Sequence, residues 1–543
     1  MREMTGGEAV VATLQCEGVE AIFGIPGTYN LSVYDALYAT PPIRHVLACH
    51  EGGAAMMADG YARASGRPGV CLTIAGPGAT NALTGLVTAH AESSPVLMVA
   101  TEIDKALIGL DRGVSHEIKQ QLDVFRAALV SAVRADTVPA IPPAIHQAMA
   151  VMRRGRPRPT YVEVPWDVLG ERGDVRLSGP APVEKPAGEP VAIEAAARLL
   201  EQAERPLIFS GVGTLRAGAS AELRRVAEAL NCPVITTAGG KGSLPEDHPC
   251  ALGAGVGRNP VLTGALARAD VVLAVGTSFD TWSMQGWTLE VPRRLIRIDI
   301  AAEQLQKNYP PEIAIRSDAR LALAQLAAAL PAWARRDRAY AADLKVSANA
   351  ARAAAEAAGD AGPRVVRQLR AALPRDAILT VDLAMILQWI AWNFEVYTPN
   401  GLLLPWNSAT LGFALPAALG AQIAWPERAV VALVGDGGFL FTGQELLTAA
   451  QHDLPVVTIV FNNRAHGSIK KQQASGFGGR YLGVDLAGPD FMALAQAFGV
   501  RGERVETPDA LGACMQRALE ARAPTLLEVR VGLQAMNHPW VVF

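Results

Sequence analysis

The stretch “AVVALVGDGGFLFTGQELLTAAQHDLPVVTIVFNN”, residues 429–463, decides the fold of the last part of this chain. It starts as an apolar run typical of a buried strand, turns at Gly-Asp-Gly (435–437), and ends in a second apolar run before Asn463. Between the two runs, Thr442-x-x-Glu445 matches a capping box, the pattern that starts a helix. Two buried strands joined by a helix are the repeating unit of a parallel α/β sheet.

Asp436 and Asn463 each come at the end of one of these two strands. Parallel α/β sheets bind ligands at the carboxyl ends of their strands, and the glycines beside Asp436 allow a ligand to come close to the backbone. A carboxylate and a carboxamide are oxygen ligands that Mg²⁺ accepts together with water and diphosphate oxygens. A Gly-Asp-Gly triplet alone is equally typical of a tight turn, but its pairing with an asparagine after the next strand predicts a metal-bridged diphosphate site.

The same alternation of apolar strands and helices continues outward through the whole chain. It predicts an α/β protein of three doubly wound parallel-sheet domains, at residues 1–170, 190–330 and 360–543. A stretch rich in Pro, Gly and charge, residues 171–190, is the expected first linker. An Ala-rich helical segment at about 320–360 is expected to lead into the third domain.

Composition narrows the class of protein. The 543 residues carry a net charge of −3 with both signs interspersed, which does not indicate a nucleic-acid partner. No apolar run approaches the roughly 18 residues of a membrane span, and the six cysteines form no Cys-x-x-Cys pair. The opening, where Thr5-x-x-Glu8 predicts a capped helix, lacks the apolar core of a signal peptide. We therefore expect a cytoplasmic protein whose partner is a small molecule or another copy of itself, and neither nucleic acid nor a membrane.

A second stretch, “RHVLACHEGGAAMMADGYARASG” at residues 44–66, sets a strand against a helix with Glu51 at the join. Acidic residues are favoured in the first turn of a helix, where they meet unpaired N–H groups and the positive end of the dipole. Taken alone, Glu51 therefore fits a structural cap better than a catalytic residue.

Several segments, in order along nearly the whole chain, resemble the thiamine-diphosphate-dependent enzymes of the acetolactate synthase, benzoylformate decarboxylase and 2-oxo acid decarboxylase superfamily. Besides the Gly-Asp-Gly and Asn-Asn pair, they are “FGIPG” (23–27), “HEGGAAMMADGYAR” (50–63), “GPGATNAL” (76–83), “RPRPTYVEVPWDV” (156–168), “GKG” (240–242), “IRIDI” (296–300) and “LGFALPAALGA” (411–421). The resemblance implies a pyrimidine-binding domain, a central domain and a diphosphate-binding domain.

The resemblance also implies roles for individual residues. Glu51 would contact N1′ of the aminopyrimidine ring of thiamine diphosphate and so favour removal of the C2 proton to give the ylide, which attacks a 2-oxo acid and loses CO₂ to leave an enamine. Leu411 would be the bulky residue that bends the cofactor, while Asp436, Asn463 and the carbonyl of Ala465 would hold Mg²⁺. The other expected cofactor-binding residues are Ala409, Gly435, Gly437, Gly438, His466, Gly467, Ser468 and Ile469.

The resemblance to this family also implies how the chains assemble. In it, the glutamate of one chain meets the diphosphate domain of another, so that Glu51 and Asp436 of different chains complete each site. We therefore expect a homodimer or a homotetramer with its sites at the subunit interface.

The fate of the enamine depends on the substrate pocket, where this chain departs from the acetolactate synthases. Gln120 matches the glutamine of their Phe-Gln-Glu triplet, but Lys119 and Gln121 replace its neighbours. Ser468 and Gln472 stand near where those enzymes place a methionine and a tryptophan. The segment “VGTSFDTW” also lacks the arginine and paired acids of flavin-carrying relatives, so FAD is not expected.

Three further residues are expected in the pocket. Thr28 is either a substrate-facing side chain or a helix cap, and His116 is either a proton carrier or a surface histidine beside Glu117; Gln120 is the other candidate for proton transfer. Trp406 and Asn407 line the cavity or belong to the core.

The leading hypothesis is thus a thiamine-diphosphate- and Mg²⁺-dependent decarboxylase or carboligase acting on a 2-oxo acid. Acetolactate synthase is the alternative within this class. A catalytically silent scaffold that only binds the cofactor is the alternative of another class.

Overall fold

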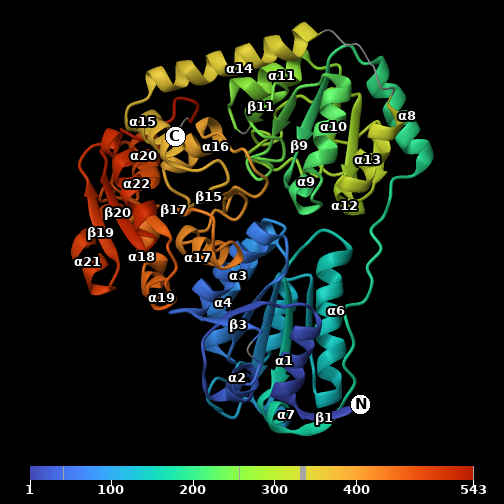
Figure 1. Cartoon of the computed structure of the whole chain (residues 1–543), viewed down its shortest axis with the longest axis vertical. Coiled ribbons are helices and arrows are strands. Elements are labelled where there is room, and N and C mark those ends of the chain that lie inside the picture. Colours follow the sequence, from blue (N-terminus) through green and yellow to red (C-terminus); the bar gives the residue numbers. More distant parts are fainter. Residues whose placement is uncertain (41, 256, 331–337, 542–543) are drawn as a thin grey trace.

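Three open sheets, each of six parallel strands, account for most of the computed structural model, which describes residues 1–40, 42–255, 257–330 and 338–541. In Figure 1 the N-terminal unit lies below, the central unit at the upper right and the C-terminal unit at the upper left. The α/β class expected from the strand and helix pattern is confirmed.

The N-terminal sheet has the strand order β3-β2-β4-β5-β7-β6. Alternate residues of its strands face opposite sides: Ile22 and Val70 pack with α1 and α6, while Phe23 and Cys71 pack with α3 and α4. Its elements are β2 (Ala21–Gly24), β3 (Arg44–Leu47), β4 (Gly69–Thr73), β5 (Val96–Glu102), β6 (Ser131–Arg134) and β7 (Thr160–Pro165), with α1 (Gly6–Cys16), η1 (Thr28–Asn30), α2 (Leu31–Tyr38), α3 (Glu51–Ser65), α4 (Pro77–Ala91), η2 (Lys105–Leu107), α5 (Gln121–Ala128), η3 (Val138–Ala140), α6 (Ile141–Arg154) and α7 (Trp166–Gly170).

The central sheet has the strand order β11-β10-β9-β12-β13-β14, so the direction of winding reverses between β9 and β12. Helix α14 packs against this unit and, in Figure 1, extends along the top of the molecule towards the C-terminal unit. The elements are β9 (Pro206–Ser210), β10 (Val234–Thr236), β11 (Ala251–Ala254), β12 (Val271–Val275), β13 (Leu295–Asp299) and β14 (Ile313–Arg316), with α8 (Pro190–Gln202), α9 (Val212–Arg216), α10 (Ser220–Leu230), α11 (Pro260–Arg268), α12 (Ala302–Leu305), α13 (Ala319–Ala329) and α14 (Arg338–Ala358).

The C-terminal sheet has the strand order β16-β15-β17-β18-β20-β19. Its elements are β15 (Ile378–Val381), β16 (Leu402–Leu403), β17 (Val430–Gly435), β18 (Val457–Asn462), β19 (Arg501–Val505) and β20 (Thr525–Arg530), with α15 (Ala361–Ala372), α16 (Ile386–Asn393), α17 (Ala414–Ala424), α18 (Asp436–Thr442), α19 (Glu445–Gln451), α20 (Gly467–Gly476), α21 (Phe491–Ala497), η4 (Pro508–Ala510) and α22 (Leu511–Ala521).

Of the two capping boxes predicted from the sequence, one is confirmed and the other is wrong. The capping box at Thr5 and Glu8 is confirmed, since each side chain accepts a hydrogen bond from the backbone N–H of the other residue. The capping box at Thr442 and Glu445 is wrong: α18 already begins at Asp436, and the Thr442 hydroxyl donates to the carbonyl of Gly412. Glu445 has partners in the N-terminal unit instead, so a tertiary contact replaces the local one.

The segments expected between the domains are more ordered than a linker pattern suggests. Residues Arg172–Val175 form β8, which pairs antiparallel with β1 (Arg2–Thr5) and so closes the N-terminal unit. The Ala-rich segment contains α13 and α14, and its residues 331–337 lie outside the described part of the chain. In the part of the chain that the structure describes, no helix is long and apolar enough to cross a membrane.

Helices α3 and α17 join the N-terminal and C-terminal units through a shared apolar core. The two backbones touch at glycines: a Cβ on Gly60 would lie 2.1 Å from the carbonyl oxygen of Ala417, and one on Gly420 would lie 1.9 Å from that of Met57. Real side chains cannot approach so closely, so any larger residue at either position would force the helices apart. This contact fixes how α3, which begins at Glu51, packs against the C-terminal unit.

Candidate active site

The Gly-Asp-Gly turn lies where strand β17 passes directly into helix α18. Because β17 and β18 are parallel neighbours, their carboxyl ends, which carry Asp436 and Asn463, meet at one edge of the sheet. The glycines are needed for close approach: a Cβ on Gly437 would lie 2.7 Å from the His466 ring, and one on Gly438 would lie 2.3 Å from Oδ2 of Asp382. The turn is therefore packed against both neighbouring segments.

The Asp436 carboxylate is buried, with 3% of the residue exposed. Its Oδ1 accepts a hydrogen bond from the Gly437 N–H at 3.0 Å, whereas its Oδ2 is buried with no hydrogen-bond partner among the described residues. Burial raises the pKa of Asp436, and the backbone N–H groups of Gly437 and residues 463–465 lower it. A buried carboxylate oxygen without a partner is costly unless a cation binds it, so the side chain fits a metal ligand.

The neighbouring loop supplies the other expected ligands. Asn463 Oδ1 accepts a hydrogen bond from the Ala465 N–H at 3.0 Å, which leaves a second lone pair on this oxygen. Ala465 is held by a bridge to Asp485, and α20 starts two residues later at Gly467. A carboxylate, a carboxamide and a backbone carbonyl are the oxygen donors that suit Mg²⁺, and the unpaired N–H groups of α20 suit a phosphate. The residues present therefore fit a metal-bound diphosphate.

Asp382 is a residue of this site that the sequence interpretation missed. It is fully buried, and its carboxylate accepts hydrogen bonds from the N–H groups of Gly412 at 2.9 Å and Phe413 at 3.3 Å. Burial raises the pKa of Asp382 to about 6. These bonds fix the turn that carries Leu411 against Gly438, in which Ala409 and Gly412 have positive φ. Asp382 lies at the end of β15, on the same sheet edge as β17, and this position could have identified it from the sequence.

Glu51 is the first residue of α3, but it is not the cap of this helix. His50 takes that place, because its Nδ1 accepts a hydrogen bond from the Gly52 N–H at 3.0 Å. The Glu51 Oε2 accepts instead from Nδ2 of Asn81 at 3.0 Å. Glu445 of the C-terminal unit accepts from the N–H groups of Cys49 and His50, both at 3.1 Å. Glu51 therefore lies in the first turn of α3, as expected of an acidic residue there, but His50 rather than Glu51 makes the capping hydrogen bond.

The other candidates of the N-terminal unit lie on the loops that follow its strands. Thr28 is the exposed first residue of the short helix η1 and makes no capping bond. The next residue, Tyr29, donates from its hydroxyl to the carbonyl of Ser115 and packs edge-on against the half-buried His116 ring. Gln120 is exposed and comes just before α5. The structure thus packs Tyr29, the residue after Thr28, against His116, and the segment from β5 to α5 (103–120) contains the short helix η2.

Gln121 does not belong to the pocket, although it aligns with the glutamate of the family triplet. It is fully buried, and its Oε1 accepts from the N–H of Gly76 at 2.7 Å. Its Nε2 donates to the carbonyl of Thr101, the hydroxyl of Tyr161 and Oε2 of Glu163. Gln121 is therefore a buried support of the turn before α4.

The candidates form two groups, one at the strand ends of each terminal unit. No hydrogen bond joins Glu51 to Asp436, Asn463 or Ala465 among the described residues, and the roles of these residues stay predictions. Within one chain, Glu445, whose pKa is raised by burial, links the C-terminal unit to the backbone just before Glu51.

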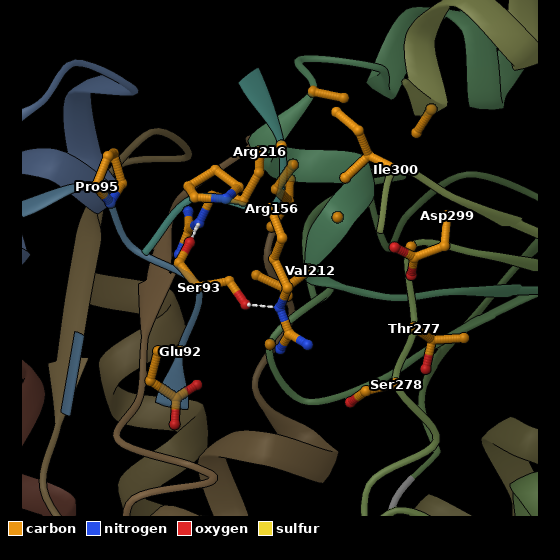
Figure 2. Close-up of a pocket in the computed structure, with 18 of the residues that line it drawn as sticks. Glu92, Ser93, Pro95, Arg156, Val212, Arg216, Thr277, Ser278, Asp299 and Ile300 are labelled. Atoms are coloured by element: carbon orange, nitrogen blue, oxygen red, sulfur yellow. Dashed lines mark hydrogen bonds between the residues drawn. The ribbon is translucent and has the colours of Figure 1, made fainter. Parts of the chain in front are cut away.

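A cavity of about 210 Å³ lies between the N-terminal and central units. Figure 2 shows Ser93 on one side, Asp299 at the end of β13 on the other, and the side chains of Arg156 and Arg216 close to Ser93. Arg156 Nε donates to the Ser93 hydroxyl at 2.7 Å, and Arg216 Nε donates to the Ser93 carbonyl at 2.9 Å. Thr277 also lines this cavity, at the reversal point of the central sheet. It belongs to the segment “VGTSFDTW”, which is not expected to bind FAD.

The C-terminal unit contributes Trp406 and Asn407 to the wall of the same cavity. Glu92 accepts a hydrogen bond from the N–H of Asn407 at 2.5 Å, and the hydroxyls of Thr88 and Thr410 are 2.8 Å apart. Both contacts hold the segment that leads to Leu411, so helix α4 and the residue after it support the expected cofactor loop from the side.

Comparison with known proteins identifies the class. Three models of the thiamine pyrophosphate enzymes match in order: the N-terminal TPP binding domain at residues 4–126, the central domain at 193–326 and the C-terminal TPP binding domain at 382–529. Thiamine pyrophosphate is another name for thiamine diphosphate. The chain belongs to the thiamine pyrophosphate enzyme family.

Its relatives within that family carry more than one activity in their names. A probable acetolactate synthase large subunit of Methanocaldococcus jannaschii is 36% identical over 97% of this chain and 92% of its own length. A probable 2-ketoarginine decarboxylase, AruI, of Pseudomonas aeruginosa is 36% identical over 97% of this chain and 94% of its own length. The acetolactate synthase large subunit of Parasynechococcus marenigrum is 33% identical over 99% of this chain and 89% of its own length.

Proposed function

We propose that this protein is a thiamine-diphosphate- and Mg²⁺-dependent enzyme that decarboxylates a 2-oxo acid and either releases the product as an aldehyde or joins it to a second carbonyl compound. The observation that carries the proposal is the Asp436 carboxylate, buried with an unpartnered oxygen beside Asn463 at a sheet edge lined by glycines. Among the described residues, no hydrogen bond uses Oδ2 of Asp436, whereas the Mg²⁺ of a metal-bound diphosphate would.

The chain's own residues would divide the work as follows. Thiamine diphosphate supplies a carbon nucleophile and an electron sink for cleavage next to a carbonyl group. Asp436, Asn463 and the carbonyl of Ala465 would hold Mg²⁺, and Glu51 would hold a proton at N1′ of the aminopyrimidine. Leu411, on the turn fixed by Asp382, would supply the bulk that keeps the cofactor bent.

The remaining candidates concern the substrate. His116 and Gln120 would move or orient a proton on the substrate, and Thr28 would contact it from the neighbouring loop. The packing of Tyr29 on His116 supports a common pocket for two of these residues.

Acetolactate synthase is the second candidate, because two of the three relatives described above bear this name. Against it stand Lys119 and Gln121 in place of the family's phenylalanine and glutamate. The burial of Gln121 away from the pocket means that only Lys119 of these two differences faces the solvent.

The experiment that tests the proposal is a substrate panel. Purified protein with thiamine diphosphate and Mg²⁺ is given pyruvate and aromatic, branched, basic and acidic 2-oxo acids, and CO₂ and the organic products are identified. We expect CO₂ release from one class, with an aldehyde, a hydroxyketone or acetolactate distinguishing the reactions. Cofactor binding without CO₂ release from any member would overturn the proposed reaction and favour the silent scaffold.

We also propose that the active unit is a homodimer or a homotetramer, with Glu51 and Asp436 of each site on different chains. Large apolar side chains beside Asp436 support this, since Leu440, Phe441 and Leu447 are 50%, 57% and 46% exposed in the isolated chain. Six free cysteines support the further proposal of a reducing, cytoplasmic location.

Mixing two inactive variants tests the shared site. When Glu51→Gln and Asp436→Asn chains are co-expressed, we expect half of the dimers to be mixed and each mixed dimer to hold one intact site, so activity returns to about a quarter of the wild-type level. Each variant expressed alone is the control. No recovery in isolated mixed dimers would show that each site is built from one chain.

A further inference from the structure

The Glu51 carboxylate is held by one side chain from a different helix. Asn81, in the second turn of α4, donates from Nδ2 to Oε2 of Glu51 at 3.0 Å. Among the described residues this is the only side-chain hydrogen bond to that carboxylate. The other oxygen, Oε1, lies 3.4 Å from the position that a Cβ on Gly78 would occupy, so no side chain from the start of α4 covers it.

The turn before α4 fixes the start of the helix that carries Asn81. Gly76 has φ +63° and ψ −118°, and a Cβ there would lie 2.4 Å from the carbonyl oxygen of His116. Its N–H is held by the buried Gln121, and the N–H of Ala75 donates to the hydroxyl of Thr101 at 2.9 Å. The helix therefore starts from a turn fixed in the core of the N-terminal unit.

The packing of α4 on α3 fixes the distance between the two side chains as well. A Cβ on Gly52 would lie 3.2 Å from the backbone oxygen of Asn81, so the helices approach closely beside Glu51. A free glutamate side chain samples many rotamers, and fixing it in one of them costs conformational entropy. The bond from Asn81 selects one of them before any ligand binds.

We propose that Asn81 is a positioning residue for Glu51. It holds one carboxylate oxygen, and it leaves the other free to take the ring nitrogen of the cofactor. The inference rests on the proposed function, because it assigns Asn81 a role only through Glu51. Asn81 itself is exposed in the isolated chain and has no role in the core, so its replacement does not disturb the fold.

The test compares Asn81→Ala with Asn81→Asp. The alanine removes the donor, whereas the aspartate has the same size but presents a charged oxygen to Glu51. We measure the rate at which the C2 hydrogen of bound thiamine diphosphate exchanges with deuterated solvent, by acid quench and proton NMR, together with the Kd of the cofactor and the melting temperature. Thr84→Ala, an exposed position one turn further along α4, is the matched control.

For Asn81→Ala we expect the exchange rate and kcat to fall together by about 10- to 100-fold, as for a misplaced catalytic group. The Kd should change by less than about threefold, since diphosphate binding supplies most of the affinity. Asn81→Asp should be worse than Asn81→Ala. A purely structural role would give the opposite order, because aspartate preserves the shape of asparagine.

Wild-type exchange in both Asn81 variants would overturn the inference, and so would a loss of melting temperature and cofactor binding in parallel with the exchange rate. Glu51→Gln separates this failure from failure of the proposed function. If Glu51→Gln stops the exchange while the Asn81 variants do not, the function stands and the positioning role is wrong. If Glu51→Gln exchanges at the wild-type rate, both are wrong.

Discussion

Glu51→Gln is expected to lower kcat by about 10²–10⁴-fold, the range of a lost general acid–base group, while the protein still binds thiamine diphosphate with Mg²⁺. The carboxamide has the shape of the carboxylate but cannot carry a proton to and from N1′ of the aminopyrimidine. The measurement is CO₂ release with the best substrate of the panel, alongside the Kd of the cofactor.

The structure indicates that Glu51→Gln removes the carboxylate without disturbing helix α3. His50 caps α3, and Glu445 holds the backbone at Cys49 and His50, so the helix does not depend on the Glu51 carboxylate. We therefore expect an unchanged melting temperature. Glu20→Gln, the same chemical change in an exposed ion pair with Arg67, is the control and should keep full activity. Normal turnover in Glu51→Gln would refute the assigned mechanism.

Asp436→Asn is expected to weaken the binding of thiamine diphosphate in the presence of Mg²⁺ by at least about 100-fold, since even the supporting partners of metal ligands contribute 10- to 100-fold. The rise in melting temperature that a bound cofactor produces in the wild-type protein should then disappear at the same ligand concentration. Thermal shift with and without Mg²⁺ measures this.

Without ligand, the expected effect of the same substitution has the opposite sign. Oδ2 of Asp436 is buried with no hydrogen-bond partner in the described part of the chain, and burial raises the pKa of this group, so the charged side chain is a cost to the empty protein. The variant should therefore melt at the same or a higher temperature than the wild type when no cofactor is added. The control is Asp485→Asn, because Asp485 is exposed and forms an ion pair with Lys470 of helix α20. A full cofactor-induced shift in Asp436→Asn would exclude Asp436 as a metal ligand.

The sequence pattern predicted the sheets and the meeting of Asp436 with Asn463 because both depend on periodicity and on the geometry of parallel strands. Apolar runs mark β17 and β18, and adjacent parallel strands must end at the same edge. The capping box at Thr442 and Glu445 failed for a physical reason. Glu445 finds stronger partners far away in the chain, at the N–H groups of Cys49 and His50, than the local helix start offers.

The supporting residues of the site were beyond the reach of sequence patterns. Asn81 reaches Glu51 only because α4 packs on α3, and Asp382 reaches Gly412 only because the segment after β16 returns beside β15. Gln121 looked like a pocket residue by its position in the family triplet, and only its burial shows that it supports Gly76 instead. Such contacts depend on packing between distant segments, which a single sequence does not encode in any local pattern.

The segment from β5 to α5, residues 103–120, bears on how the enzyme could acquire new substrates. Under the proposed function, Glu51 and the Leu411 turn act on the cofactor itself, so a substitution there costs activity rather than stability. Lys119 and Gln120, by contrast, are exposed on a segment that supports no other element through their side chains. Natural drift or directed evolution can therefore vary these two positions with little loss of stability, and under the proposed function such changes would alter the substrate pocket without replacing a residue that holds the cofactor. The same fold can in this way change its substrate specificity more readily than the reaction that it catalyses.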